Sequence, residues 1–335
     1  MTTAASRIFC ASRDRSASAT RCQRNLVRTA APRSAAAAGS ARPGRPLRLA
    51  FGERHGWITP LAALPLVPAF AILVCVPLAL RAVGPGDSTG RLLIATYPIA
   101  AAAAILAIVL PSGIPAAAIA LIWLAFTVLA ALHGLTRVFG SSGRIEELCI
   151  AVGFMYLAVG GGWLVLWRSG LPVMDFGEHV PLLTAIHFHY AGFASPILVG
   201  FVGREVRAAG SRFWPLYVGA ASLVIVGPAL VALGIAGVRQ IEAPAAAILA
   251  SGTAVVALIA VATVLTRVRG MVARGLLAVS SAAAIVAMTL ATLYAVGNPL
   301  EISAIGLEDM VRWHGSFNAL GYVFCGLLGW NVRRM

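Results

Sequence analysis

The stretch TAIHFHYAGF, residues 184–193, lies inside an apolar run of about residues 181–203. That run is long enough to cross a bilayer, which takes roughly 20 residues of helix. It therefore carries His187, His189 and Tyr190 into a membrane-spanning segment. Ionisable side chains at that depth are costly and indicate function by default. The stretch predicts a membrane protein with a polar site.

The composition supports this class of protein. Hydrophobic residues make up 59% of the 335 residues and charged residues 11%, with a mean hydropathy of +0.88. Soluble domains carry roughly 25% charged residues, so a soluble fold could not bury this much apolar surface. A transmembrane barrel needs short alternating segments, whereas the apolar runs here are long and continuous. We expect an all-α, polytopic helical membrane bundle.

The number of spans follows from the apolar runs, each close to the length that a bilayer requires. Prolines at 65, 68 and 77 predict an irregular first helix, because proline removes a backbone donor. We expect about nine transmembrane helices, or eight if the first run does not span. The runs are about 61–80, 92–110, 114–132, 147–167, 181–203, 215–236, 244–265, 275–296 and 309–330.

The N-terminal segment, residues 1–56, differs from the membrane domain, residues 57–335. It is rich in Arg, Ser and Ala and holds eleven arginines against two acidic residues, a net charge of +9 out of +14 for the whole chain. Such a segment cannot bury enough apolar surface to fold alone. We expect a disordered tail, or a start site assigned too far upstream. Without interleaved aromatic residues its charge does not predict nucleic-acid binding.

The arginines of the membrane domain give an orientation. They follow the first, third, fifth and seventh runs and close the chain, and the intervening loops have few. Because cytoplasmic loops carry the excess of Arg, we expect a bacterial inner-membrane protein with a cytoplasmic C-terminus. Nine spans would then leave the arginine-rich tail outside, unless the first run does not cross. The arginines are Arg81, Arg91, Arg137, Arg144, Arg204, Arg207, Arg212, Arg267, Arg269, Arg274, Arg333 and Arg334.

On an ideal α-helix the two histidines of the fifth run point in nearly opposite directions. His187 shares a face with Ala191 and Ala194, while His189 lies on the other side. They therefore cannot both bind one ion. Pro196 should free the carbonyl of Gly192, which would add a polar group near the histidines.

A second polar place lies in the last run. His314 and Asn318 share a stripe with Gly321, Cys325 and Gly329. Small residues allow close helix packing, so the stripe is either a docking face with interhelical hydrogen bonds or a functional site. We expect the fifth and ninth spans to pack together there, with His187 and His314 at one site.

Acidic side chains precede both histidine helices. Asp175 and Glu178 lie before the fifth run, and Glu301, Glu308 and Asp309 before the ninth. By the arginine pattern both loops fall on the outer side. We expect Asp175 and Glu178 to line the rim of the histidine site.

Two motifs resemble a known family. The stretch 184–193 and the second motif, MVRWHGSFNALG at residues 310–321 followed by GLLGW at 326–330, are similar to the hallmarks of the YndJ-like family of bacterial membrane proteins. The resemblance covers roughly residues 60–335. It implies a multi-pass membrane protein and points to the same histidines, without adding a reaction.

Two functions fit these residues. The first is a transporter of a small solute or ion, with His187, Tyr190, His314 and Asn318 lining the site and histidine coupling movement to protons. The alternative is a membrane-embedded enzyme that holds zinc or haem through His187, His189 and His314. No HExxH, Walker or CxxC motif is present to indicate another chemistry.

Overall fold

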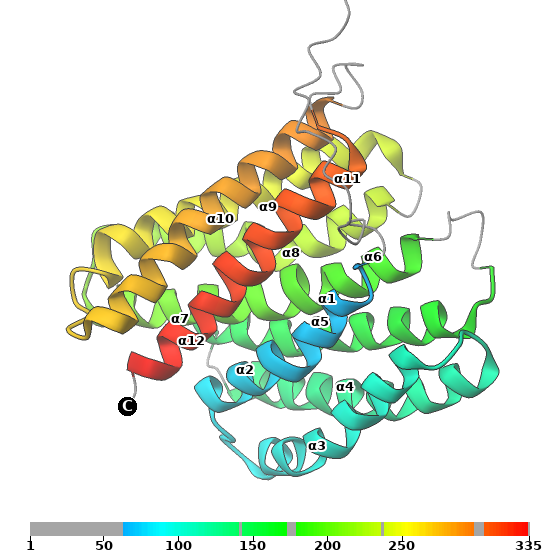
Figure 1. The fold of residues 1–335 in the computed structure, drawn as a ribbon. Helices are drawn as coiled ribbons and strands as arrows, with labels where there is room; N and C mark the ends of the chain where they lie inside the picture. Colours follow the sequence, from blue (N-terminus) through cyan, green and yellow to red (C-terminus); the bar gives the residue numbers. More distant parts are fainter. Residues whose placement is uncertain (1–62, 141–142, 173–178, 236–237, 298–304, 334–335) are drawn as a thin grey trace, which may run out of the picture. The chain divides into compact units, whose positions relative to one another are not determined.

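The structure is a computed structural model, and it describes residues 63–140, 143–172, 179–235, 238–297 and 305–333. The N-terminal tail lies outside the described residues. Within them the chain is helical without strands, and it forms nine helical segments (Figure 1). The expected helical bundle is confirmed.

Four of the nine segments contain π-helical stretches, labelled η. The first comprises α1 (Leu66–Phe70), η1 (Ala71–Cys75) and α2 (Val76–Val83), and it is followed by α3 (Ser88–Val109), α4 (Ile114–Gly140) and α5 (Ile145–Ser169). The fifth comprises α6 (Val180–His187), η2 (Phe188–Ala194) and α7 (Ser195–Ala208). Then come α8 (Trp214–Ile235), α9 (Arg239–Ile259) with η3 (Ala260–Val264), and α10 (Met271–Gly297). The ninth comprises α11 (Leu307–Asp309), η4 (Met310–His314), η5 (Phe317–Phe324) and α12 (Cys325–Arg333).

Eight of these segments, including the first, are long and apolar enough to cross a membrane. The ninth, which carries the second polar motif, is not among the eight but packs alongside them against α10 and α2. We refer below to the arginine-rich end of the bundle, which holds the α2–α3, α7–α8 and α9–α10 turns and Arg333. The two histidine motifs lie toward the opposite end.

The fifth segment is the centre of the bundle. Of its apolar window 78% is buried, against 28–50% for the other seven candidate spans. Glycines let α5 approach it closely: a Cβ at Gly153 would lie 2.7 Å from the carbonyl oxygen of Phe193, and one at Gly160 would lie 2.8 Å from His189 Nδ1. Small residues at helix contacts allow this proximity in membranes. The polar motif is therefore carried by the most enclosed helix.

The irregular first helix has a local cause. Val76 N–H bonds to the carbonyl of Ala71, five residues back, and the next residue, Pro77, has no N–H. The carbonyl of Ile72 thus has no donor from its own helix in this register. The Tyr97 hydroxyl of α3 donates to it at 2.9 Å. A hydroxyl from a neighbouring helix satisfies the backbone group that proline leaves free, as a lipid environment requires.

Candidate functional site

The first motif forms the π-helical stretch η2 in the middle of the fifth segment. Ser195 N–H bonds to the carbonyl of Tyr190, five residues back. With this five-residue spacing, the carbonyl that Pro196 leaves without a donor is that of Ala191. An α-helix would instead leave the carbonyl of Gly192, as the sequence had predicted. Single π-turns within α-helices are frequent at functional sites. The wider turn also changes which side chains share a face.

His189 is fully buried, and both of its ring nitrogens are engaged. Nδ1 lies 2.8 Å from the carbonyl oxygen of Ala185, and Nε2 lies 3.2 Å from the indole nitrogen of Trp123 on α4. A carbonyl only accepts and an indole N–H only donates. The arrangement therefore specifies a neutral imidazole with its proton on Nδ1. Protonation or ligation at Nε2 would break the bond from Trp123.

His187 and His314 are held differently. Each is half-buried and bonds one ring nitrogen to the backbone of another helix: His187 Nε2 to the carbonyl of Pro228 on α8 at 3.2 Å, and His314 Nδ1 to that of Ala287 on α10 at 2.8 Å. Since carbonyls only accept, these nitrogens donate. The other nitrogen of each ring has no hydrogen-bond partner among the residues that the structure describes.

His187 and His314 occur at matching places in their segments. His187 is in α6 and His314 at the end of η4, each about two turns from the start of its segment. The arrangement presents two anchored imidazoles, each with one nitrogen able to accept a proton, bind a cation or accept a hydrogen bond.

The remaining predicted site residues divide into three groups. Tyr190 is buried and donates its hydroxyl to the carbonyl of Val67 at 2.9 Å, which ties η2 to the first helix. Asn318 is half-buried, and its amide has no hydrogen-bond partner in the described part of the chain. Asp175 and Glu178 lie outside the described residues.

The small residues of the ninth segment pack mainly on α10. Gly321 faces Ala283, and a Cβ at Gly329 would lie 3.0 Å from the Leu277 side chain. Gly321 and Gly329 therefore dock the ninth segment on α10, and the expectation that Gly321 faces the fifth segment is wrong. His314 makes its interhelical bond on the same helix, α10.

The fifth and ninth segments nevertheless pack together, as predicted, through other residues. The hydroxyls of Ser195 and Tyr322 lie 3.0 Å apart. Toward the arginine-rich end the rings of Phe201 and Trp330 are 5.5 Å apart, and the Glu205 carboxylate pairs with Arg333 at 2.8 Å. These contacts place α12 beside α7, and the two helices can be found by their labels in Figure 1.

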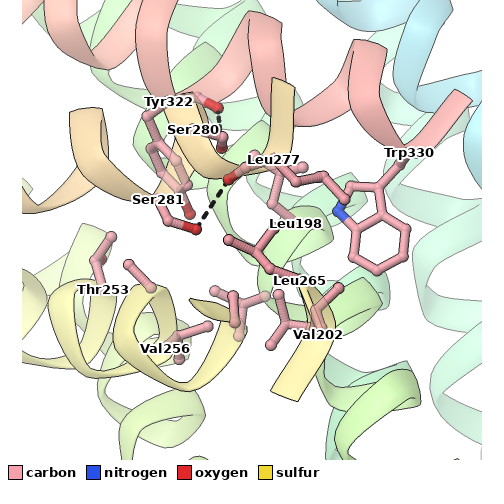
Figure 2. A pocket seen from close by; sticks show the side chains of 14 residues that line it. Leu198, Val202, Thr253, Val256, Leu265, Leu277, Ser280, Ser281, Tyr322 and Trp330 are labelled. Carbon is pink, nitrogen blue, oxygen red and sulfur yellow. Dashed lines mark hydrogen bonds between the residues drawn. The ribbon is translucent and has the colours of Figure 1, made fainter. Parts of the chain in front are cut away.

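A small cavity lies beside this contact (Figure 2). It is enclosed by α7, α9 with η3, α10 and the ninth segment, and its volume of about 30 Å³ is that of one water molecule. The Ser280 hydroxyl donates to the carbonyl of Tyr322 at 2.7 Å, and that of Ser281 to the carbonyl of Leu277 at 3.0 Å. These two serine hydroxyls are thus bonded to backbone and that of Tyr322 to Ser195, so a solute would need a wider conformation.

An ion-pair network at the arginine-rich end was not predicted. Glu147 accepts Nε–H and Nη2–H of Arg204 at 2.6 and 2.8 Å and Nη2–H of Arg137 at 2.9 Å. Glu146, almost fully buried, pairs with Arg207 at 2.6 Å. The signal was present in the sequence, since two adjacent acids begin the fourth apolar run. The arginines were interpreted only as an orientation signal, so their partners were missed.

Asp87 fixes the α2–α3 turn at the same end. Its carboxylate accepts the N–H of Gly90 at 2.7 Å and lies 3.1 Å from Nδ1 of the buried His133. The bond from the Gly90 N–H, followed by the attraction of His133, lowers the pKa of Asp87 below its ordinary value of 3.8, against a smaller opposing effect of burial. The turn is therefore tied to both α3 and α4.

The metal or haem alternative gains little from this geometry. Among the described residues no three His, Cys, Asp or Glu side chains are grouped so that they could hold a metal ion. His189, one of the three ligands expected, already uses both nitrogens.

The fold defines a polytopic helical membrane protein whose fifth and ninth segments each carry a half-buried histidine. Comparison with known families is consistent with this: the model for YndJ-like protein matches residues 66–322, and the chain belongs to that family. The chain is also 33% identical over 242 residues to the "Uncharacterized membrane protein YndJ" of Bacillus subtilis (strain 168). The match covers 72% of this chain but 42% of that relative's length. No solved structure matches.

Proposed function

We propose that this protein transports a small solute or ion across the bacterial inner membrane and couples the movement to protons at His187 and His314. The observation that carries the proposal is the pair of anchored imidazoles, each with one nitrogen that has no hydrogen-bond partner in the described residues. Imidazole is the side chain whose ordinary pKa lies near physiological pH.

Two further features support transport rather than a static role. Asn318 lies one turn beyond His314, and its amide, which has no hydrogen-bond partner among the described residues, could hydrogen-bond a solute. The π-helical stretches η2, η4 and η5 occur in the two segments that carry the motifs. Such irregular turns are frequent at functional sites, and a change of register there would let a wider passage open beside the histidines.

We further propose that the arginine-rich end faces the cytoplasm, by the positive-inside rule. The histidine pair would then lie in the outer half of the membrane, and Asp175 and Glu178 would lie on the side from which an external solute enters. Reporter fusions after Arg144 and Arg269 should indicate the cytoplasm, and a fusion after Glu178 the outer side. The reverse pattern would contradict the orientation and leave the histidine site untouched.

The transport proposal is tested in proteoliposomes that contain the full chain and an internal pH dye. A panel of small ions, amines, carboxylates and sugars is added outside, one at a time. At least one should drive internal pH change with wild-type protein, and the double variant H187Q/H314Q should lose it while H179Q, on the exposed loop side, retains it. Absence of any solute-driven proton movement, or equal movement in the double variant, would contradict coupling through this pair.

A further inference from the structure

A second cavity lies at the arginine-rich end, between the last turns of α7 and α12. Its volume is about 250 Å³, and it is lined by Phe201, Arg204, Glu205, Trp330 and Arg333. Pockets for drug-sized ligands measure roughly 300–1,000 Å³, so this one suits a smaller group. The buried rings of Phe201 and Trp330 pack 5.5 Å apart and form one wall.

The lining carries a net charge of +1, from two arginines and one glutamate. The guanidinium carbon of Arg333 lies 5.1 Å from the Trp330 ring centre, and that of Arg204 lies 5.7 Å from that of Phe201. Each arginine is also fixed by a carboxylate: Arg333 by Glu205 at 2.8 Å and Arg204 by Glu147. Both charged groups are therefore held in place before any ligand arrives.

These ion pairs leave donors free. A guanidinium has five N–H groups. Arg204 uses two of them on Glu147, and Arg333 uses one on Glu205. In the described part of the chain, no further acceptor bonds to either group. Planar arginine donors match the oxygens of a phosphate group, often in pairs.

The depth of the cavity indicates which phosphate it meets. α7, the end of a candidate membrane span, stops at Ala208, and the adjacent α12 stops at Arg333, so the cavity lies near the end of that span. Lipid headgroups occupy that level, and Trp and Arg are favoured there because an apolar body can remain in lipid while the polar tip reaches the interface. We propose that this cavity binds the phosphate of an anionic phospholipid headgroup. A phosphodiester carries one negative charge, which balances the lining.

A titration of the full chain in a maltoside detergent, which contains no phosphate, tests this site. The probe is dihexanoyl-phosphatidylglycerol, and bound lipid is counted by native mass spectrometry. Wild type should bind one lipid per chain at saturation, less tightly at high salt because exposed charges are screened. R333Q should weaken binding about tenfold, as expected for loss of a charge-assisted hydrogen bond. E205Q should tighten it about fivefold by removing a negative charge from the lining.

The matched control is R212Q, because Arg212 is exposed at the same end and does not line the cavity. It should leave binding unchanged. If R333Q is unstable, E205Q alone decides, since its predicted effect has the opposite sign. Equal binding in wild type, R333Q and E205Q would overturn the proposal. Equal binding of dihexanoyl-phosphatidylcholine would also overturn it, and full competition by glycerol 3-phosphate would assign the site to a soluble phosphate instead.

Discussion

The three consecutive glycines of α5, residues 160–162, provide a steric test of the fold within a single helix turn. A Cβ at Gly161 would overlap the hydroxyl of Thr127 on α4 and lie 3.1 and 3.2 Å from its Cβ and Cγ2. A Cβ at Gly162 would meet no atom within 4 Å. The same substitution, Gly→Ala, should therefore have opposite consequences at neighbouring positions.

The expected magnitude follows from these contacts. Carbon atoms pack best at about 3.5–4.0 Å, so Gly161→Ala must move Thr127 or separate α4 from α5 by several tenths of an ångström. Moving Thr127 would also disturb its bond to the carbonyl of Leu124 at 2.8 Å. Overpacking costs about 1–3 kcal/mol, and the helix propensity of Ala returns at most about 1 kcal/mol. Gly161→Ala should be destabilising by about 1–2 kcal/mol, and Gly162→Ala neutral or slightly stabilising.

The assay is equilibrium unfolding of the purified full chain by SDS in mixed micelles, followed by tryptophan fluorescence. Each variant is compared with wild type at the same detergent composition. Gly160→Ala should also be destabilising, because its Cβ would lie 2.8 Å from Nδ1 of His189. Equal stability of Gly161→Ala and Gly162→Ala would refute the packing of α4 on α5 described above.

Three further predictions concern polar groups. Glu147→Ala should lower the free energy of unfolding by about 2 kcal/mol, because it leaves two half-buried guanidinium groups without their carboxylate. SDS unfolding checks this against Glu308→Ala, which is exposed and should change the free energy of unfolding by less than about 0.5 kcal/mol. Folding lowers the pKa of Asp87 below 3.8, so the ionised carboxylate contributes its full stabilisation above the unfolded pKa. That contribution to stability is lost as the pH falls through the folded pKa. Asp87→Asn should therefore flatten the loss of thermal stability on acidification in that range, which thermal unfolding at a series of pH values measures. Tyr97→Phe should destabilise by about 1 kcal/mol in SDS unfolding, because the Ile72 carbonyl loses its donor, and no change would mean that another group satisfies it.

Much of the fold could be predicted from the sequence because hydropathy determines which segments can enter a bilayer. The nine apolar runs correspond to the nine helical segments, and the prolines at 65, 68 and 77 correctly predicted an irregular first helix. Helix ends moved by several residues; α4, for example, continues to Gly140. His133 and Arg137 on that last part make contacts that no apolar pattern records.

The site could be predicted only in part. The residues were found because polar groups are rare in such runs, but their roles depend on partners far away in the chain. Nothing in the sequence connects His189 with Trp123, 66 positions earlier, yet that bond removes His189 as a ligand. An ideal helix wheel also could not anticipate η2, whose wider turn depends on how the neighbouring helices satisfy its backbone.

The most direct measurement of the central claim is a thiol crosslinking experiment on residues 187 and 314. In a full chain without its native cysteines, the pair H187C/H314C is treated with a short bifunctional thiol reagent in membranes. The pair S195C/Y322C, whose native hydroxyls are 3.0 Å apart, is the positive control, and H189C/H314C is the matched comparison because His189 points to Trp123. We predict efficient crosslinking at 187–314 and little at 189–314. Equal or stronger crosslinking at 189–314 would contradict a site shared by His187 and His314.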